Sequence, residues 1–182
     1  MQLSNIPACP VSYDGNNFKS KLEARYYALF KELGINVVYE PTRFLMKYNM
    51  SYTPDFALYG VRWRGESAEY YTNKTGQPIF VEVKGASSYR DINTNAQVRI
   101  ETFSAKKPIL VVGNIPEFLS DLSDHRGDKM FNFYFMDGGR ETCFFCRKGN
   151  EIWLEGIDEN DFRFSSIEKE LSIARQAFQN ER

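Results

Sequence analysis

Three charged residues, Asp55, Glu82 and Lys84, lie in segments whose other residues are typical of buried β-strands. The segments are Tyr52-Thr-Pro-Asp-Phe56 and Ile79-Phe-Val-Glu-Val-Lys-Gly85. Side chains alternate between the two faces of a strand, so Glu82 and Lys84 share one face. Burying an unpaired charge is costly, and such residues are rarely core filler. Two carboxylates and a lysine at adjacent strand ends could hold a divalent metal ion and a water molecule beside a phosphate.

The chemistry that suits this set is hydrolysis of a phosphodiester. That reaction needs a nucleophile made from water at neutral pH, and it needs negative charge on the phosphate oxygens to be stabilised. A bound Mg²⁺ ion meets both needs, and Mn²⁺ is expected to substitute for it. Asp55 and Glu82 are the predicted oxygen ligands. Lys84 would orient or deprotonate the attacking water, and surroundings of low dielectric constant would favour a lowered pKa for its ammonium.

Several elements must position these residues. A helix is predicted over residues 17–33, because apolar residues recur there at three- and four-residue spacing and Gly34 follows as a stop. Strands are predicted at 35–39, 44–47, 52–59, 78–84 and 108–112, and a second helix runs from 94 to about 105.

The remainder of the chain has the alternating pattern of a β-meander. The predicted elements there are a short helix at 116–122, strands at 131–136, 141–146 and 151–154, and a final helix at 166–179. Ser165 and Glu168 have the spacing of a capping box for that last helix.

This order of elements resembles the PD-(D/E)xK nuclease superfamily, with Glu23 in the first helix, Asp55 after a proline, and the run Glu82-Val-Lys84 in a strand. The likeness covers residues 17 to about 112. In detail the chain looks like small phage or mobile-element nucleases, and more distantly like Holliday-junction resolvases and the nuclease subunit of some transposases.

The resemblance implies an α/β fold with a restriction-endonuclease-like αβββαβ core around a central mixed sheet. Residues 1–112 would form that core, and residues 113–182 would add a β-meander and a C-terminal helix packed on it within a single domain.

The resemblance also implies the site. Glu23, Asp55, Glu82 and Lys84 would be catalytic, and the backbone carbonyl of Val83 would be a third metal ligand beside Asp55 and Glu82. Glu23 would bind a second metal ion or hold a metal-bound water. The implied activity is metal-dependent endonucleolytic cleavage of DNA without a nucleotide cofactor, and DNA rather than RNA is expected on family grounds alone.

Each site residue has a simpler alternative explanation. Glu23 follows Ser20 by three residues, so the pair could form a capping box, although an apolar residue before them favours a helix start nearer Asn16 or Asn17. Asp55 follows a proline and could be a turn residue. A Glu-x-Lys pair on the exposed face of a strand is also common. The four residues in this order on these elements are much more specific than any one of them.

Further residues could contact DNA. The basic and aromatic candidates for backbone phosphate contacts are Lys19, Lys21, Arg25, Tyr89, Arg90 and Arg99, with scattered surface charge as the alternative. Gln97 resembles a glutamine found beside the active site in some branches of the family, but Thr94 and Gln97 have capping-box spacing, which is the favoured interpretation.

Composition narrows the remaining classes. A chain of 182 residues that is 42% hydrophobic and 15% aromatic can bury a core as one domain. No run of about 18 apolar residues predicts a membrane span, and the N-terminus lacks a secretory signal pattern. Three cysteines, an odd number, suit a reducing compartment, so we expect a cytoplasmic protein without disulfides.

Other catalytic chemistries fit less well. His125 is the single histidine, which argues against nucleases that need two and against Ser-His-Asp hydrolysis. Cys143 and Cys146 are half of a zinc site without a second half, so they are expected to be packing thiols. No phosphate-binding glycine loop is present.

The formal net charge of −1 is low for a protein that must neutralise phosphates, but its distribution is uneven. Residues 1–112 contain 14 Lys/Arg and 10 Asp/Glu, whereas residues 113–182 contain 9 and 14. The acidic half motivates one alternative to a self-sufficient endonuclease, a catalytically silent module that inhibits or recruits another protein. The resemblance to transposase subunits allows another, a nuclease subunit that needs a partner protein for targeting. A homodimer is a further option.

Overall fold

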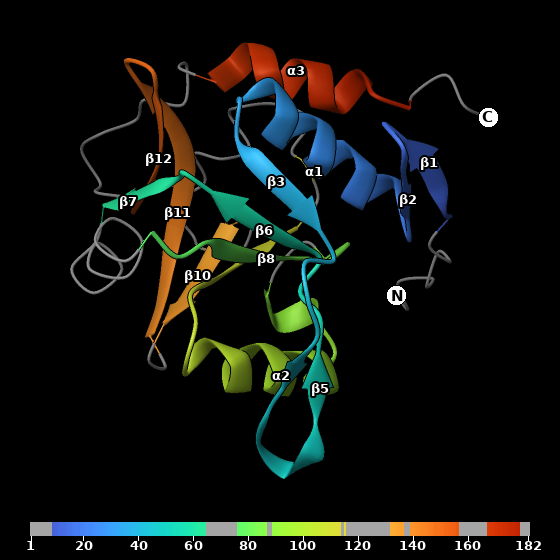
Figure 1. Cartoon of the computed structure of the whole chain (residues 1–182), viewed down its shortest axis with the longest axis vertical. Helices are drawn as coiled ribbons and strands as arrows, with labels where there is room; N and C mark the ends of the chain where they lie inside the picture. The colour runs from blue at the N-terminus through green and yellow to red at the C-terminus, as the bar shows by residue number, and fades with distance from the viewer. Residues whose placement is uncertain are drawn as a thin grey trace.

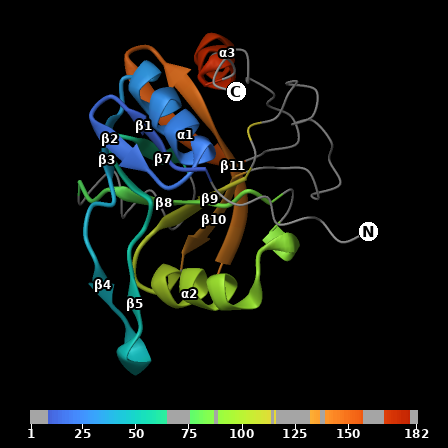
Figure 2. The same ribbon diagram turned by 90° about the vertical axis from the view of Figure 1, so that its right-hand side faces the viewer.

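The computed structural model shows a mixed α/β protein in which helices cover both faces of a large sheet (Figures 1 and 2). The residues that the structure describes are 9–64, 76–86, 89–113, 115, 132–136, 139–156 and 167–178. The α-helices of this part are α1 (Lys21–Glu32), α2 (Thr94–Ser104) and α3 (Glu168–Gln176). Two short 3₁₀ turns are η1 (Lys47–Asn49) and η3 (Tyr89–Asp91).

The strands form one large sheet and two small hairpins. The large sheet has the order β3-β6-β8-β9-β10-β11-β12-β7, and the hairpins are β1-β2 and β4-β5. In chain order the strands are β1 (Val11–Tyr13), β2 (Asn16–Phe18), β3 (Asn36–Tyr39), β4 (Phe44–Leu45), β5 (Ser51–Tyr52), β6 (Phe56–Tyr59), β7 (Arg62–Arg64), β8 (Ile79–Val83), β9 (Ile109–Val112), β10 (Asn132–Met136), β11 (Gly139–Lys148) and β12 (Glu151–Gly156).

The large sheet is mixed, as the sequence predicts. Strands β3, β6 and β8 are antiparallel neighbours, and helix α2 then carries the chain across to β9, which pairs with β8 in parallel. Such a parallel pair requires a crossover connection. The meander β10-β11-β12 adds to β9 as a direct continuation of the same sheet.

The sheet folds back on itself. Strands β6 and β7 are separated only by Gly60 and Val61, yet they stand second and last in the strand order. Strand β11 makes this return, because residues 139–142 pair with β10 and residues 143–148 pair with β12. Helix α1 lies within the curve.

A residue of α1 shows how both halves of the chain share one core. The ring of Phe30 lies 5.5 Å from that of Phe56 on β6 and 5.8 Å from that of Phe145 on β11, measured between centroids. Phe30 is fully buried. The C-terminal meander is therefore part of the packing around α1.

The alternation predicted for β8 is confirmed. Ile79, Val81 and Val83 pack in the cluster that contains α1, whereas Phe80 packs in the cluster on the α2 face. Phe80 contacts Phe103 of α2 edge to face, with centroids 5.3 Å apart. Glu82 follows Phe80 by two residues, so β8 directs its carboxylate towards the α2 face.

The predicted start of the first helix is wrong. Asn16–Phe18 is strand β2, paired with β1, and α1 begins only at Lys21. Ser20 is the N-cap, because its side-chain oxygen accepts a hydrogen bond from the Glu23 N–H. Phe18, which suggested an earlier start, is a buried residue of the hairpin. A local cap outweighed apolar periodicity here.

Two other boundaries also differ from expectation. The predicted strand at 52–59 is interrupted, since β5 ends at Tyr52 and β6 begins at Phe56. Helix α3 begins at Glu168 with Ile167 as its N-cap, which is too late for a capping box at Ser165 and Glu168. Ser165, the predicted helix at 116–122 and His125 lie outside the described residues.

All three cysteines are described and are thiols, as expected, and Cys143 and Cys146 are buried in β11. Among the described helices, none has the length and apolar character needed to span a membrane.

Candidate active site

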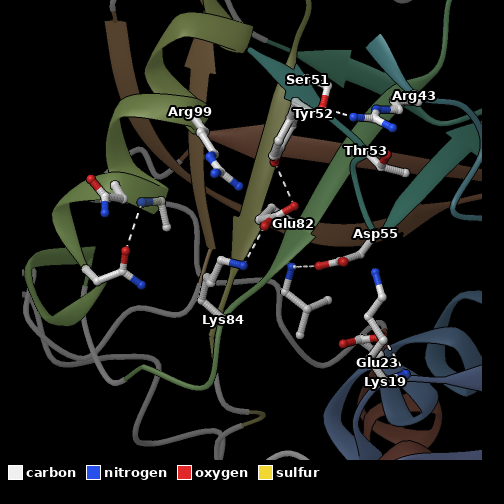
Figure 3. A pocket seen from close by; sticks show the side chains of 14 residues that line it. Lys19, Glu23, Arg43, Ser51, Tyr52, Thr53, Asp55, Glu82, Lys84 and Arg99 are labelled. Atoms are coloured by element: carbon white, nitrogen blue, oxygen red, sulfur yellow. Dashed lines mark hydrogen bonds and ion pairs between the residues drawn. The ribbon is translucent and has the colours of Figure 1, made fainter. Parts of the chain in front are cut away.

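Two carboxylates meet where β6 begins and β8 ends. The antiparallel register pairs Phe56 with Val81, so Asp55 stands opposite Glu82 one step beyond the ladder. Both residues are buried, with exposed fractions of 8% and 6%. The Val83 N–H donates a hydrogen bond of 2.7 Å to Asp55 Oδ2 (Figure 3). Asp55 is thus held by the backbone of the strand that carries Glu82, and it is not an exposed turn residue.

Glu82 is held by two partners from different elements. The Tyr52 hydroxyl, from β5, donates to Glu82 Oε2 at 2.6 Å. The Lys84 ammonium forms an ion pair with Glu82 Oε1 at an N–O distance of 2.5 Å. Figure 3 shows the Glu82 carboxylate between these two side chains. Each of its oxygens has a donor, which accounts for its burial at tolerable cost.

The prediction of a lowered pKa for Lys84 is wrong. Burial lowers the pKa of this ammonium, but the nearby carboxylates of Glu82 and Asp55 together raise it by more, so the net shift is upward from 10.5. Lys84 is therefore a cation at neutral pH in this arrangement. Low dielectric constant alone would have had the opposite effect.

Asp55 shows the opposite imbalance. Burial, followed by repulsion from Glu82, raises the pKa of the Asp55 carboxyl to about 8. Lys84 and the Val83 N–H oppose this shift without cancelling it. The pair of carboxylates is therefore short of positive charge, which is the condition in which a cation is bound favourably.

Glu23 caps the start of α1 and also accepts hydrogen bonds from Tyr39 and from the Lys19 backbone. It is the capping-box residue of α1, since Ser20 Oγ donates to its Oε1 at 3.1 Å while Ser20 accepts from its N–H. Its Oε2 accepts from the Tyr39 hydroxyl at 2.8 Å and from the Lys19 N–H at 3.1 Å. Burial and the bond to Glu23 raise the pKa of the Tyr39 hydroxyl far above 10.

A polar pocket of about 570 Å³ brings these groups together. All four predicted catalytic residues and Val83 line it. The other lining residues are Lys19, Arg43, Ser51, Tyr52, Thr53, Asn93, Asn95, Ala96 and Arg99. Figure 3 shows these side chains converging from α1, the β4-β5 hairpin, β8 and α2. Of the predicted DNA-contacting residues, Lys19 and Arg99 belong to the pocket.

Several predicted DNA-contacting residues do not line the pocket. Arg25 turns towards α3, where its Nε donates to the Ala177 carbonyl at 3.1 Å. Tyr89 is buried, and its hydroxyl donates to Glu101 Oε1. Arg90 is exposed and Lys21 is half-buried, both outside the pocket lining.

Gln97 has neither of the two predicted roles. It is absent from the pocket lining, and the N-cap of α2 is Asn93, whose side chain accepts from the Ala96 N–H, so a capping box at Thr94 is wrong. The Gln97 amide donates to the carbonyls of Tyr89 and Ile92 at 2.9 and 2.8 Å. Gln97 therefore stabilises the turn at residues 89–92, which precedes α2.

The backbone of Val83 faces the carboxylate pair. The Lys84 N–H donates to the Val112 carbonyl on β9 at 2.8 Å. Successive residues of a strand direct their backbone groups to opposite sides, so the N–H and carbonyl of Val83 face β6. The Val83 N–H already bonds Asp55 there. The Val83 carbonyl is thus directed to the side on which Asp55 lies.

These residues fit a divalent cation. Within the described part of the chain no three acidic, histidine or cysteine side chains converge closely enough to enclose an ion. The donors that this part of the chain could offer such an ion are Asp55, Glu82 and the Val83 carbonyl, and water or substrate oxygens would complete the set. Mg²⁺ keeps several waters and takes few protein carboxylates, which matches a set of this size. Glu23 has its oxygens bonded to Ser20, Tyr39 and the Lys19 N–H.

Sequence reasoning missed several residues of the pocket. Tyr52 stands inside the Tyr52–Phe56 segment but received no role, although its separation from Asp55 by a Thr-Pro break was a signal that the strand turns there. Tyr39 and Arg43 carried no local pattern, because their places depend on pairing between distant segments.

No protein-family model matches the chain, and neither a curated protein nor a solved structure matches it.

Proposed function

We propose that the protein is a metal-dependent nuclease that hydrolyses phosphodiester bonds of DNA, with Mg²⁺ or Mn²⁺ at the Asp55–Glu82 pair. The single observation that supports this most is a buried pair of carboxylates that is short of positive charge, inside a largely basic pocket. Besides this pair and Glu23, the charged residues that line the pocket are Lys19, Arg43, Lys84 and Arg99. The order α1-β3-β6-β8-α2-β9, with β8 and β9 parallel, is in keeping with a restriction-endonuclease-like core.

The residues of the chain divide the work as follows. Asp55, Glu82 and the Val83 carbonyl would hold the ion. A bound Mg²⁺ supplies charge stabilisation on the phosphate and acidifies water to give a nucleophile at neutral pH. The Val83 N–H fixes the rotamer of Asp55, and Tyr52 fixes that of Glu82, so the ligands are oriented before the substrate arrives.

Lys84 acts as a cation in this proposal. Its raised pKa keeps a proton on Nζ at neutral pH, so it stabilises negative charge developing on the phosphate rather than accepting a proton from water. Its side chain is 30% exposed, which leaves the ammonium open to the pocket. Lys19, whose ammonium pairs with Glu40, and Arg99 lie on opposite walls, and both could contact neighbouring phosphate groups.

Cleavage assays test this proposal. The purified protein should cut at least one member of a panel of duplex, nicked, branched and single-stranded DNA with Mg²⁺ or Mn²⁺, and EDTA should abolish cleavage. Asp55→Asn and Lys84→Gln should lower the rate by about 100-fold or more, because each removes a charge that acts on the transition state.

The matched controls are Glu151→Gln and Lys148→Gln. Glu151 on β12 and Lys148 on β11 are exposed residues outside the pocket lining, and their ion pairs, with Arg62 and Glu155, contribute little to stability. Both controls should cut like the unmodified protein. Absence of cleavage with either metal, or full activity of Asp55→Asn, would refute the proposal. Under a purely binding role, Mn²⁺ would also fail to raise the melting temperature.

A further inference from the structure

A hairpin arm, residues 43–52, projects from the body beside α2. Strands β4 and β5 pair Phe44 with Tyr52 and Leu45 with Ser51, and within the described part of the chain they form a sheet of their own. The arm is closed at its tip by a hydrogen bond from the Met46 N–H to the Met50 carbonyl at 2.8 Å. Figures 1 and 2 both show it extending past α2, away from the large sheet.

The base of the arm is packed firmly on the protein. The ring of Phe44 lies 5.2 Å from Phe80 and 5.1 Å from Phe103, and that of Tyr52 lies 5.0 Å from Phe103. Tyr52 also bonds Glu82. The arm is therefore held in a fixed place relative to the candidate catalytic residues.

A second pocket also lies beside the arm. It has a volume of about 610 Å³ and lies between the arm and the C-terminal half of α2. Leu45 lines it and is 85% exposed. Leu45 thus presents an aliphatic side chain to solvent at the edge of this pocket.

One stripe of α2 connects the two pockets. Asn95, Arg99 and Thr102 follow one another at intervals of four and three residues, which puts them on a single face of α2, and Lys106 lies in the turn just after the C-cap, Ala105. Asn95 and Arg99 line the pocket with the carboxylates, and Thr102 and Lys106 line the second pocket.

This surface is strongly basic, although the chain as a whole is not. Residues 41–53 and 94–107 contain five Lys/Arg and one acidic residue, whereas the formal charge of the chain is −1. That acidic residue, Glu101, accepts the Tyr89 hydroxyl. Among the described residues none forms an ion pair with Lys47, Arg99 or Lys106. Such a surface is complementary to a polyanion.

We infer that the hairpin arm and the α2 stripe form a docking surface for duplex DNA, with one backbone along Arg99 and Lys106 and the arm in the major groove. A two-stranded β-ribbon has the size that this groove admits. The inference rests on the proposed function and deepens it by naming duplex DNA as the substrate.

The aromatic residues favour a duplex over a single strand. Proteins that bind single strands stack bases on exposed aromatic rings. On the described side chains of this surface, Phe44 is half-buried and Phe103 is buried, and both rings face the core of the arm base. Among the described side chains of this surface, the exposed ones are charged or polar, or they are aliphatic, as at Leu45, Val98 and Ala105. They suit phosphate contacts and a groove wall.

Binding measurements separate this inference from catalysis. The full chain, with EDTA, is titrated onto a fluorescent duplex of about 30 base pairs, roughly three helical turns, at several salt concentrations. The double variant Lys47→Ala/Lys106→Ala should bind about tenfold more weakly, and the slope of log K against log salt should fall by about 2. Leu45→Ala should also weaken binding, because it removes an exposed groove contact.

The control is Lys31→Ala/Lys148→Ala, which removes the same charge from exposed positions on α1 and β11. It should keep the affinity and the salt slope of the unmodified protein. Hydrolysis of a small phosphodiester, bis(p-nitrophenyl) phosphate, with Mn²⁺ reports the pocket alone, and the Lys47→Ala/Lys106→Ala variant should retain it.

The outcomes are distinct. If no diester is hydrolysed but the arm variant still loses duplex binding, the proposed function fails and the docking surface stands. Equal affinity and salt slope for the arm variant and the unmodified protein would overturn the docking surface. Tighter binding of single-stranded DNA or RNA than of the duplex would overturn the assignment of the partner.

Discussion

Asp55 makes the stability of the protein depend on pH in a direction unusual for a carboxylate. Its pKa is raised to about 8 in the folded state, against an ordinary value near 3.8. The folded protein therefore binds more protons than the unfolded chain between these values, and stability must fall as pH rises through that window. The contribution is complete below about pH 4 and is lost above about pH 8.

The corresponding measurement is thermal unfolding with EDTA between about pH 5 and about pH 9. The unmodified protein should lose melting temperature across this range relative to Asp55→Asn, whose amide stays neutral and still accepts from the Val83 N–H. Asp14→Asn, at an exposed carboxylate, should follow the unmodified protein. Parallel curves for Asp55→Asn and the unmodified protein would contradict the shift. Saturating Mn²⁺ should reduce the loss.

Tyr52 is the second residue with a direct test. Tyr52→Phe keeps the ring on Phe103 but removes the hydroxyl that donates to Glu82. A buried carboxylate then loses one donor, and the free energy of unfolding should fall by about 1–3 kcal/mol. Urea denaturation measures this change. Tyr59→Phe, at an exposed position, should change it by less than about 0.5 kcal/mol.

At this scale the sequence predicted which residues meet but not the ionisation of each. Asp55, Glu82 and Lys84 were identifiable because charges interrupt apolar strands. The raised pKa of Lys84 could not be predicted from the sequence, because it depends on how closely two carboxylates approach the ammonium. The register of β6 against β8 fixes that distance.

Among the elements, the segments that follow β8 and β9 approach each other closely. A Cβ added to Gly113 would lie 2.6 Å from the Ala86 carbonyl oxygen, and the Gly113 carbonyl accepts the Tyr26 hydroxyl at 2.8 Å. Gly113→Ala should therefore lower the free energy of unfolding by about 1–3 kcal/mol.

Gly85→Ala is the matched control, because a Cβ there meets nothing within 4 Å. It should be nearly neutral in urea denaturation. Equal effects of the two substitutions would contradict the close approach at Gly113.

The predicted helices and strands match the structure where no cap or short hairpin strand interrupts the apolar periodicity. Helix α2, strand β8 and strand β9 follow the predicted ranges closely. The predicted start of α1 differs from the observed one, because Ser20 caps the helix while Phe18 belongs to a hairpin of two three-residue strands. Short strands held by pairing leave a weak local pattern.

At the scale of the whole molecule, both tryptophans lie at one end of the sheet. Trp63 is on β7 and Trp153 is on β12, in strands that pair in parallel. Because α1 packs against both halves, this end should unfold together with the helices. Tryptophan fluorescence and far-ultraviolet circular dichroism should give one coincident urea transition, and separate midpoints would indicate independent units.

The sequence predicted a meander packed on the core but not that it extends the same sheet. Residues 113–182 differ in charge from the rest, which suggested an addition. Pairing of β10 with β9 and of β12 with β7 depends on contacts between segments tens of residues apart, for which a single sequence carries no signal.

The return of β7 to β12 has a consequence for how the chain is made. Ribosomes deliver the N-terminal part first, so Glu23, Asp55, Glu82 and Lys84 all emerge well before residues 151–156. Until β12 has been synthesised, β7 lacks the strand that it pairs with in the sheet. Strand β6, which precedes β7 in the chain, already has its partners β3 and β8 by then. Closure of the sheet must therefore wait for late synthesis, and a nascent chain would hold the complete set of candidate catalytic residues on an unfinished scaffold.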